Sequence, residues 1–210
     1  LPPHDEELLD HPDIMASFNV TEADIRRTLF DVLKAELPDA KKATLQTQYR
    51  MSKPIGDLIS TCFYAGNLVS VNESVIDGYA NLVGKQVRWL DTSEHPRRAE
   101  YESRNGGFTN PVEARVIANE VEKIAKLVMS RHLKVDAEKF ELLVVSPYAA
   151  QKRVIESELS IRNVNNINWR VLTADSVQGS EADIVLVATT RSNARKSLGF
   201  LRQEQWRRIN

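Results

Sequence analysis

Apolar side chains recur every three or four residues in four stretches of the chain, which is the spacing of one face of an α-helix. The predicted helices cover Thr21 to Pro38, Lys53 to Tyr64, Asn110 to Arg131 and Tyr148 to Leu159. Thr21 and Asn110 are residue types that cap helix N-termini, and Pro54 is tolerated in a first helical turn. We therefore expect four amphipathic helices, with a long one beginning at Asn110.

Shorter stretches between these helices have the patterns of β-strands. Ala43 to Tyr49 alternates between apolar and polar residues, and Val87 to Leu90 and Arg170 to Thr173 are short strand-like runs. Phe140 to Val145 and Asp183 to Ala188 are almost wholly apolar, which is typical of strands in a buried parallel sheet. Because strands and helices alternate, the sequence predicts an α/β layered domain.

Two segments lack such patterns. Residues 1–20 are acidic and contain proline, which predicts a partly disordered loop or linker. Residues 91–107 are polar and predict a mobile surface loop. We accordingly expect a linker and helix at residues 1–40 and a globular domain at residues 41–210. The abrupt start and stop of the chain suggest a fragment of a larger protein.

Composition narrows the class of protein. The 210 residues are 42% apolar and 27% charged, with a formal net charge of -1. A dedicated nucleic-acid-binding protein usually has a positive excess, so any such contact must use a local patch or backbone donors. The single Cys62 excludes an internal disulfide framework and fits a reducing compartment. The sequence shows no membrane-spanning run or secretory signal, so we expect a cytoplasmic, nucleoid or nuclear protein without a membrane partner.

Gln48, Tyr49 and Arg50 lie where a predicted strand ends and a predicted helix begins. Ligands collect at this edge of a parallel α/β sheet. An arginine there offers a planar, permanently charged donor fork, which suits phosphate oxygens and the charge that develops on a transferred phosphoryl group. The plain alternative is a surface arginine in an ordinary ion pair.

The segment from Thr173 to Glu181 connects two predicted strands. Gly179 permits a tight turn and a close approach of backbone N–H groups to an anion. The Glu181 carboxylate suits a ribose hydroxyl, while Thr173, Asp175 and Ser176 suit a nucleic-acid backbone or the bracing of this loop. An ordinary polar connection with a glycine turn is the alternative, because so short a match arises freely by chance.

Ser146, Pro147 and Tyr148 follow the buried strand and open a helix. A hydroxyl and free N–H groups at a helix N-terminus make a phosphate-sized site, although a plain helix cap has the same composition. Arg191 adds positive charge near the same predicted face, with solvated surface charge as its alternative.

Several familiar kinds of site are missing from the sequence. The stretch from Gly78 to Lys85 is spaced wrongly for a P-loop, and no G-x-x-x-x-G-K-[ST] pattern occurs elsewhere. The histidines have no Cys or Glu at ligand spacing, which argues against zinc. No Ser-His-Asp set stands out.

The order and separation of these motifs resemble the second motor domain of superfamily-one nucleic-acid helicases. The branch is the DNA2/NAM7 type, which includes RNA-surveillance and Okazaki-fragment-processing helicases. Gln48-Tyr-Arg-Met51 is similar to the family's fourth motif, and Thr173 to Glu181 is similar to its fifth. Ser146-Pro-Tyr148 resembles a strand-end motif that touches nucleic acid. Leu1-Pro-Pro3 looks like the tail of the third motif, and Arg207-Arg-Ile-Asn210 looks like the start of the sixth.

The resemblance implies a RecA-like three-layer domain with a mostly parallel central sheet. It implies that Arg50 is catalytic and reaches the nucleotide's γ-phosphate, that Glu181 meets the nucleotide sugar, and that Ser146 holds single-stranded DNA or RNA. Gln48 and Gly179 join the nucleotide-binding set, and the nucleic-acid-binding set also includes Pro147, Tyr148, Thr173, Asp175, Ser176 and Arg191. ATP and Mg²⁺ would be bound mainly by the N-terminal RecA-like domain of the parent chain, so the fragment should be inactive alone.

Two other interpretations stay open. A non-catalytic RecA-like module that binds nucleic acid or protein fits the missing P-loop and the near-zero net charge. An unrelated α/β phosphate-binding enzyme, complete in this chain, would need a nucleophile and a base that the sequence does not show.

Overall fold

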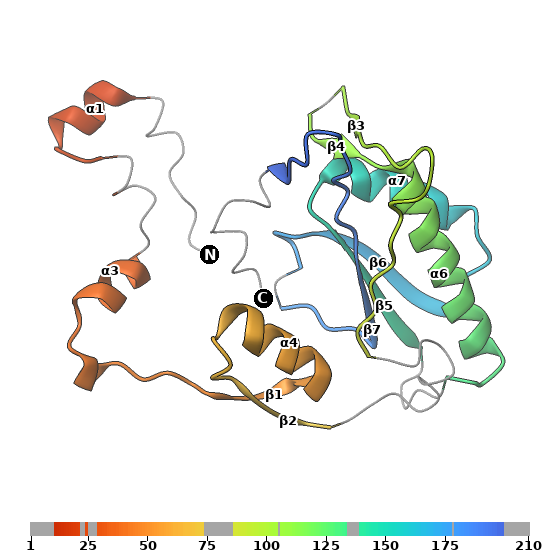
Figure 1. The fold of residues 1–210 in the computed structure, drawn as a ribbon, viewed down its shortest axis with the longest axis horizontal. Helices are drawn as coiled ribbons and strands as arrows, with labels where there is room; N and C mark the ends of the chain where they lie inside the picture. The colour runs from red at the N-terminus through yellow and green to blue at the C-terminus, as the bar shows by residue number, and fades with distance from the viewer. Residues whose placement is uncertain are drawn as a thin grey trace. The chain divides into compact units, whose positions relative to one another are not determined.

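The apolar run that starts at Phe140 forms the central strand of a parallel sheet in the computed structural model of the chain (Figure 1). β5 (Phe140–Ser146) pairs in parallel with β6 (Ile167–Thr173) and with β7 (Ile184–Val187), so the strand order is β6-β5-β7. Both edges of β5 are hydrogen-bonded, as the backbone of a buried strand requires. The structure describes residues 11–21, 24, 29–73, 86–104, 106–133, 139–177 and 179–199.

Two helices lie beside this sheet and share its core. α6 (Pro111–Met129) and α7 (Ala149–Ser160) pack against each other, and α7 also packs against β5 and β6 (Figure 1). The core that they bury with the sheet includes Ile117, Val121, Ile124, Phe140, Leu142, Val144, Ile155, Leu159 and Val171. Alternate residues of β5 enter this layer because successive side chains of a strand point to opposite faces.

Strands β5 and β6 end side by side, and this end of the sheet is called the carboxyl edge below. Ser146 is paired with Thr173, and Val145 is paired with Val187 of β7. Both α7 and the segment after β7 therefore begin at this edge. α6 also begins with a fixed turn, since the Asn110 side chain accepts a hydrogen bond from the Glu113 N–H at 3.1 Å.

A second, smaller parallel sheet is formed by an earlier part of the sequence. β1 (Thr47–Ser52) and β2 (Val69–Asn72) pair in parallel and are connected through α4 (Lys53–Phe63). Gly56 lets α4 approach the strands closely, because a Cβ there would collide with Ser70 Oγ and lie 2.6 Å from Gln48 Nε2. A short antiparallel hairpin joins β3 (Tyr101–Glu102) to β4 (Phe108–Thr109).

The chain divides into two compact units, Leu1–Gln46 and Thr47–Asn210, and the strands that the structure describes belong to the second. Described parts of the first unit are α1 (Pro12–Ser17), α3 (Leu29–Glu36) and a 3₁₀ turn at Asp39–Lys41. None of the described helices combines the length and the apolar character needed to cross a membrane.

The α/β class and the parallel strands are confirmed, and the arrangement agrees with a RecA-like domain, although the parallel sheets among the described residues are small, with two and three strands. The predicted helices at residues 53–64, 110–131 and 148–159 are present. Part of the predicted helix at 21–38 is present as α3, while residues 22–23 and 25–28 lie outside the described residues.

Several local predictions were wrong. Residues 87–90 do not form a strand, since Arg88 turns to Glu120 of α6 at 3.4 Å and Trp89 is 79% exposed. The strand predicted at 43–49 begins only at Thr47, where pairing with β2 begins, and β2 itself was not expected. α1 interrupts the predicted 1–20 loop, with Pro12 in its first turn. The 91–107 loop contains β3.

The core position of β5 leads to a stability prediction. Leu142→Ala should lower the free energy of unfolding by about 2–5 kcal/mol, because Leu142 is fully buried and truncation leaves a cavity. Val187→Ala on the neighbouring strand, where the side chain is 69% exposed, should change it by less than about 0.5 kcal/mol. Urea unfolding followed by circular dichroism measures both, and equal losses would contradict the assigned core.

Candidate functional site

A side-chain amide braces the second half of β1. Gln48 Nε2 donates to the Met51 carbonyl at 2.9 Å, and the Met51 N–H donates to Gln48 Oε1 at 2.7 Å. Gln48 thus closes a local ring that fixes the backbone on both sides of Arg50. Arg50 lies inside β1, two residues before its end, rather than after the strand as the sequence predicted.

Arg50 reaches a loop more than a hundred residues away in the sequence. Its Nη2 donates to the Ser180 carbonyl, and its Nε lies 3.5 Å from Glu181 Oε1. The side chains of Arg50 and Glu181 are 56% and 77% exposed. An ion pair so exposed contributes little to the stability of the fold, so little free energy holds Arg50 to Glu181.

The loop that presents Glu181 crosses from the carboxyl edge at β6 to the start of β7. Its far end is anchored, because Arg170 Nη2 donates to the Glu181 carbonyl at 3.2 Å and Asp183 accepts from the Glu141 N–H at 2.8 Å. Gly179 has a φ of +80° in open space, so its requirement for glycine is conformational and not steric. Gln178 lies outside the described residues.

The other candidate residues surround the carboxyl edge. The Ala174 N–H donates to the Ser146 carbonyl at 3.1 Å, and the hydroxyls of Thr173 and Ser176 are 2.9 Å apart. Ser146 itself is fully buried, and its Oγ accepts from the Tyr148 N–H at 3.3 Å. Its hydroxyl therefore braces the start of α7 in this structure. Asp175 and Ser176 are exposed, Thr173 and Pro147 are partly exposed, and Tyr148 is buried.

Arg191 lies at the same edge but faces inward. Its side chain is 7% exposed and forms two bonds to Glu100, with Nη2 2.9 Å from Oε1 and Nε 3.0 Å from Oε2. Its Nη1 donates to Tyr148 Oη at 3.0 Å, and its charge lies 4.0 Å from the centre of the Phe108 ring. Here the guanidinium holds the β3–β4 hairpin to the segment after β7 instead of facing solvent.

Glu100 is the charged partner that sequence reasoning missed. It also accepts from the Ser192 N–H at 2.6 Å and from Asn193 Nδ2 at 3.2 Å. Burial raises the pKa of the Glu100 carboxyl, but hydrogen bonds from Arg191, Asn193 and Ser192, with the Arg191 charge, outweigh burial and lower that pKa below its ordinary 4.5. No motif in the sequence marks Glu100, since its partners lie ninety residues downstream.

A second missed carboxylate is Glu113 in the first turn of α6. It accepts backbone N–H bonds from Thr189 at 2.7 Å and Thr190 at 2.8 Å, both in the segment that follows β7. Burial raises its pKa, an effect that hydrogen bonds from Thr189, Thr190 and Gln151 partly offset. Two sequence signals fell on it: its place three residues after the helix cap Asn110, which is common to many helices, and the resemblance of Thr109 to Ala114 to the family segment that opens this helix.

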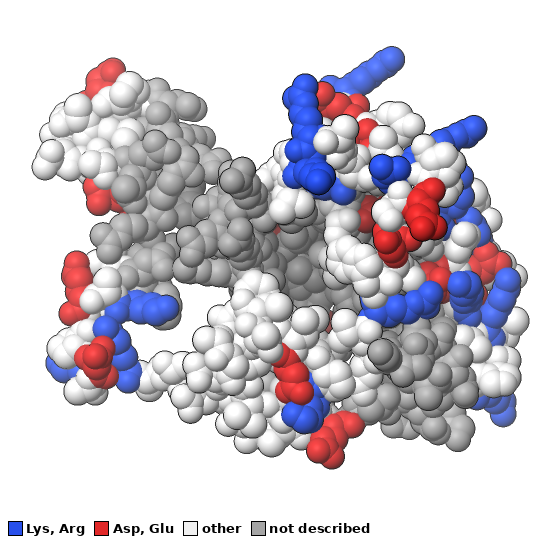
Figure 2. Space-filling view, in the orientation of Figure 1, with Lys and Arg blue, Asp and Glu red and all other residues white. Residues whose placement is uncertain are grey.

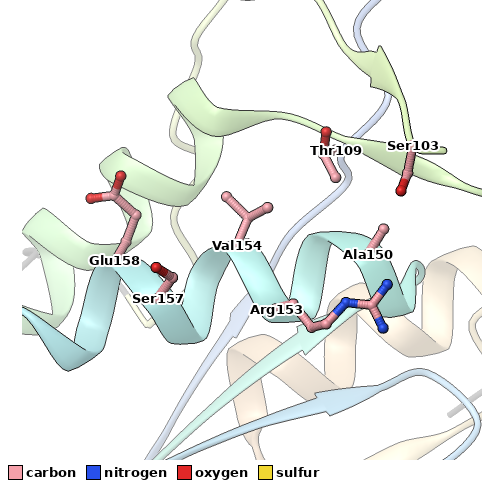
Figure 3. Close-up of a pocket in the computed structure, with 7 residues that line it drawn as sticks. All are labelled: Ser103, Thr109, Ala150, Arg153, Val154, Ser157 and Glu158. Carbon is pink, nitrogen blue, oxygen red and sulfur yellow. The ribbon is translucent and has the colours of Figure 1, made fainter. Parts of the chain in front are cut away.

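A shallow hollow of about 410 Å³ lies between α7 and the β3–β4 hairpin. Figure 3 shows Arg153, Ser157 and Glu158 on α7 on one side of it and Ser103 and Thr109 on the other. It shares no residue with the candidate set. Figure 2 shows acidic and basic side chains mixed over the visible face. Within the described ranges, no three His, Cys, Asp or Glu residues are grouped to hold a metal ion.

Comparisons with known proteins place the chain in a family. A family model described as an AAA domain (AAA_12) matches residues 25–210. The mouse DNA replication ATP-dependent helicase/nuclease DNA2 is 28% identical over 204 residues, which are 84% of this chain and 18% of that protein. The DNA polymerase alpha-associated DNA helicase A of Saccharomyces cerevisiae is 25% identical over 206 residues, 89% of this chain and 28% of that protein. The Regulator of nonsense transcripts 1 of Caenorhabditis elegans is 27% identical over 176 residues, 79% of this chain and 15% of that protein.

The chain therefore belongs to this AAA domain family, among the superfamily-one helicases of the DNA2/NAM7 type. It spans between 15% and 28% of the length of these three relatives. The resemblance drawn from the motifs is confirmed at this level, and the chain is a helicase-type domain.

The Glu100–Arg191 pair leads to a pH prediction. Because the folded pKa of Glu100 is depressed, its stabilisation should be complete above the ordinary value of 4.5 and should be lost as the pH falls through the folded pKa. A double-mutant cycle of Glu100→Gln and Arg191→Met should give a coupling of about 1–3 kcal/mol at pH 7. Urea unfolding at pH 7 and in acid measures it. A coupling that grows on acidification would refute this assignment.

Proposed function

We propose that this chain is the second motor domain of an ATP-dependent helicase or translocase. The observation that supports it most is the meeting of Arg50 with Ser180 and Glu181, since the sequence separates Arg50 from Ser180 by 130 positions. A cation and a carboxylate held at one exposed loop are the groups that a nucleotide phosphate and a nucleotide sugar would need. Residues 41–210 would form the motor domain, and residues 1–40 the linker and helix before it.

On the nucleotide side, Arg50 supplies charge and Glu181 supplies an acceptor. A phosphate would replace Glu181 as the partner of Arg50, because Arg–phosphate pairs are bidentate and charge-assisted. Glu181, released from Arg50, would then accept a ribose hydroxyl. Gln48 would position Arg50, and Gly179 would allow the turn that brings the loop close. The mouse and bovine relatives are ATP-dependent helicases by name, which supports ATP as this nucleotide.

The remainder of the nucleotide site would come from another RecA-like domain of the parent chain. The 210 residues contain no P-loop sequence, and the part of the chain described here offers no cluster for a metal. ATP and Mg²⁺ would be held mainly by that second domain. Without it, the chain should neither hydrolyse ATP nor unwind a duplex.

On the nucleic-acid side, the carboxyl edge offers donors for a single strand of DNA or RNA. The exposed Ser176 and the partly exposed Thr173 present hydroxyls, and Pro147 and Tyr148 lead into the start of α7. The Tyr148 side chain does not cap the first turn of α7, and Ala149 in that turn is exposed, so the start of this helix would offer a backbone donor to a phosphate. Ser146 and Arg191 would support this edge from beneath it, and Asp175 would border it. Phosphate contacts of this kind tolerate any base sequence.

A non-catalytic binding module is the second candidate. Arg50 and Glu181 form an ion pair with each other in this structure, and the formal net charge of the chain is -1. A scaffold without a ligand could keep both features. The two candidates differ in the parent gene, since a motor needs a Walker-type loop in its other RecA-like domain. Either function would take place in the cytoplasm or nucleus, or on a nucleoid, where nucleic acid is found.

The role of Arg50 is tested in the full-length protein. Arg50→Ala should lower the nucleic-acid-stimulated kcat for ATP about 100-fold or more, because a charge that stabilises the transferred phosphoryl group is lost. Arg115→Ala, which removes an exposed arginine on α6, serves as the matched control and should leave kcat within about twofold. Unchanged turnover in Arg50→Ala would reject this role.

The nucleic-acid side is tested with the 210-residue chain itself. It should bind a labelled single-stranded oligonucleotide of about 16 nucleotides with little sequence preference, and the binding should weaken as salt rises. Fluorescence anisotropy at several salt concentrations measures both effects. Ser176→Asp, which places a negative charge beside Thr173, should weaken binding about tenfold, while Ser157→Asp on α7 should not. Equal effects of the two variants would remove the carboxyl edge from the proposal.

A further inference from the structure

One side chain connects three segments that meet at the carboxyl edge. The Glu113 carboxylate, in the first turn of α6, accepts four hydrogen bonds from outside its own helix. Oε1 accepts from the Thr189 N–H at 2.7 Å and from the Thr189 hydroxyl at 3.0 Å. Oε2 accepts from the Thr190 N–H at 2.8 Å and from Gln151 Nε2 of α7 at 3.3 Å.

Buried amides close the network around this carboxylate. The Asn110 N–H donates to Gln151 Oε1 at 2.7 Å, and Gln151 Nε2 donates to the Asn110 carbonyl at 3.0 Å. Asn110 Nδ2 in turn lies 3.3 Å from the carbonyl of Thr190. Asn110, Gln151 and Thr190 are 2%, 0% and 0% exposed, so no water can substitute for these partners. The starts of α6 and α7 and the segment after β7 are therefore fixed to each other.

Thr190 is held in an unfavourable conformation. Its φ is +65°, in the left-handed region that a β-branched residue rarely adopts. Its buried hydroxyl has no hydrogen-bond partner among the residues that the structure describes. Both features cost free energy, which neighbouring contacts must offset. The contacts that offset this cost are the bond from the Thr190 N–H to Glu113 and the bond from Asn110 Nδ2 to the Thr190 carbonyl.

We propose that Glu113 is a positioning residue that makes the Ser146–Tyr148 turn and the Thr189–Asn193 segment one rigid nucleic-acid-binding edge. This inference rests on the proposed function, because it assigns the same edge to nucleic acid. Glu113 touches no ligand in this proposal. It acts through Gln151, which belongs to the first turn of α7, and through Thr190, which precedes Arg191.

The chemistry of the network requires a carboxylate at position 113. All four of its partners are donors, so an acceptor-only group satisfies them. A glutamine would turn an NH₂ group toward two of these donors and break the corresponding bonds. Substitution by glutamine preserves size and shape, and it therefore removes only the hydrogen-bond pattern.

A purely stabilising role gives different expectations. If Glu113 only added stability, Glu113→Gln would lower the melting temperature but leave oligonucleotide binding unchanged at a temperature where both proteins are folded. If Glu113 positions the edge, binding falls in the folded protein. Binding should then return in part when Thr190→Gly relieves the strained φ, because glycine adopts +65° without cost.

The experiment uses the 210-residue chain, a labelled oligonucleotide of about 16 nucleotides and amide hydrogen exchange. Glu113→Gln should speed exchange at the Thr189 and Thr190 amides about tenfold or more and weaken oligonucleotide binding about tenfold. The Ala188 amide, bonded to the Val145 carbonyl at 2.8 Å, should exchange as before. Adding Thr190→Gly should regain about threefold in affinity. Thr189→Val, which removes one bond, is the milder variant if Glu113→Gln does not fold, with an expected loss of about threefold.

Glu122→Gln is the matched control, since Glu122 lies on the same helix and pairs with Lys126 and Arg162 instead. It should change neither affinity nor exchange at Thr189 and Thr190. Faster exchange with unaltered affinity in Glu113→Gln would overturn the inference, and so would unaltered exchange. Failure of the unsubstituted chain to bind would instead reject the proposed function, and the inference with it, while exchange would still report the Glu113 bonds.

Discussion

The structure depends on pairing both edges of β5. A strand with almost no access to water cannot leave its N–H and C=O groups unbonded, so β6 and β7 must lie on either side of it. Parallel pairing brings Ser146, Thr173 and the end of β7 to the same edge. The starts of α7 and of the segment that includes Arg191 meet there as a consequence, although the sequence separates them by some forty positions.

The two arginines of the candidate set illustrate how environment decides the role of one residue type. Arg50 is more than half exposed, and its partners are a carbonyl and a carboxylate that other anions can replace. Arg191 is almost fully buried, bonded twice to Glu100 and stacked near Phe108. Removing a partner from the second would leave an uncompensated buried charge, whereas exchanging the partner of the first costs little. The proposed function therefore assigns the ligand to Arg50 and a structural role to Arg191.

Two carboxylates at the carboxyl edge, those of Glu100 and Glu113, point into the protein. Glu100 and Glu113 both accept backbone N–H groups from the segment after β7, so two carboxylates shape a loop that the proposed function turns toward phosphates. The oxygens of both carboxylates are taken up by these hydrogen bonds. Their negative charge is therefore directed into the protein and not toward the proposed nucleic acid. In the proposed function, this arrangement would let a chain with a formal net charge of -1 offer local donors to a nucleic acid.

Periodicity and motif spacing were sufficient to predict α4, α6, α7 and the three strands of the larger sheet, because burial of one helix face or both strand faces leaves a pattern within a few neighbouring residues. The family resemblance was equally local, since each motif is a short run. The sequence could not show β2, the loss of a strand at 87–90, or the inward turn of Arg191 and Ser146. Those outcomes depend on partners such as Glu100, Glu120 and Ser180 that lie far away along the chain. Only the folded arrangement decides which distant donor meets which acceptor, and therefore which charged groups remain available for a ligand.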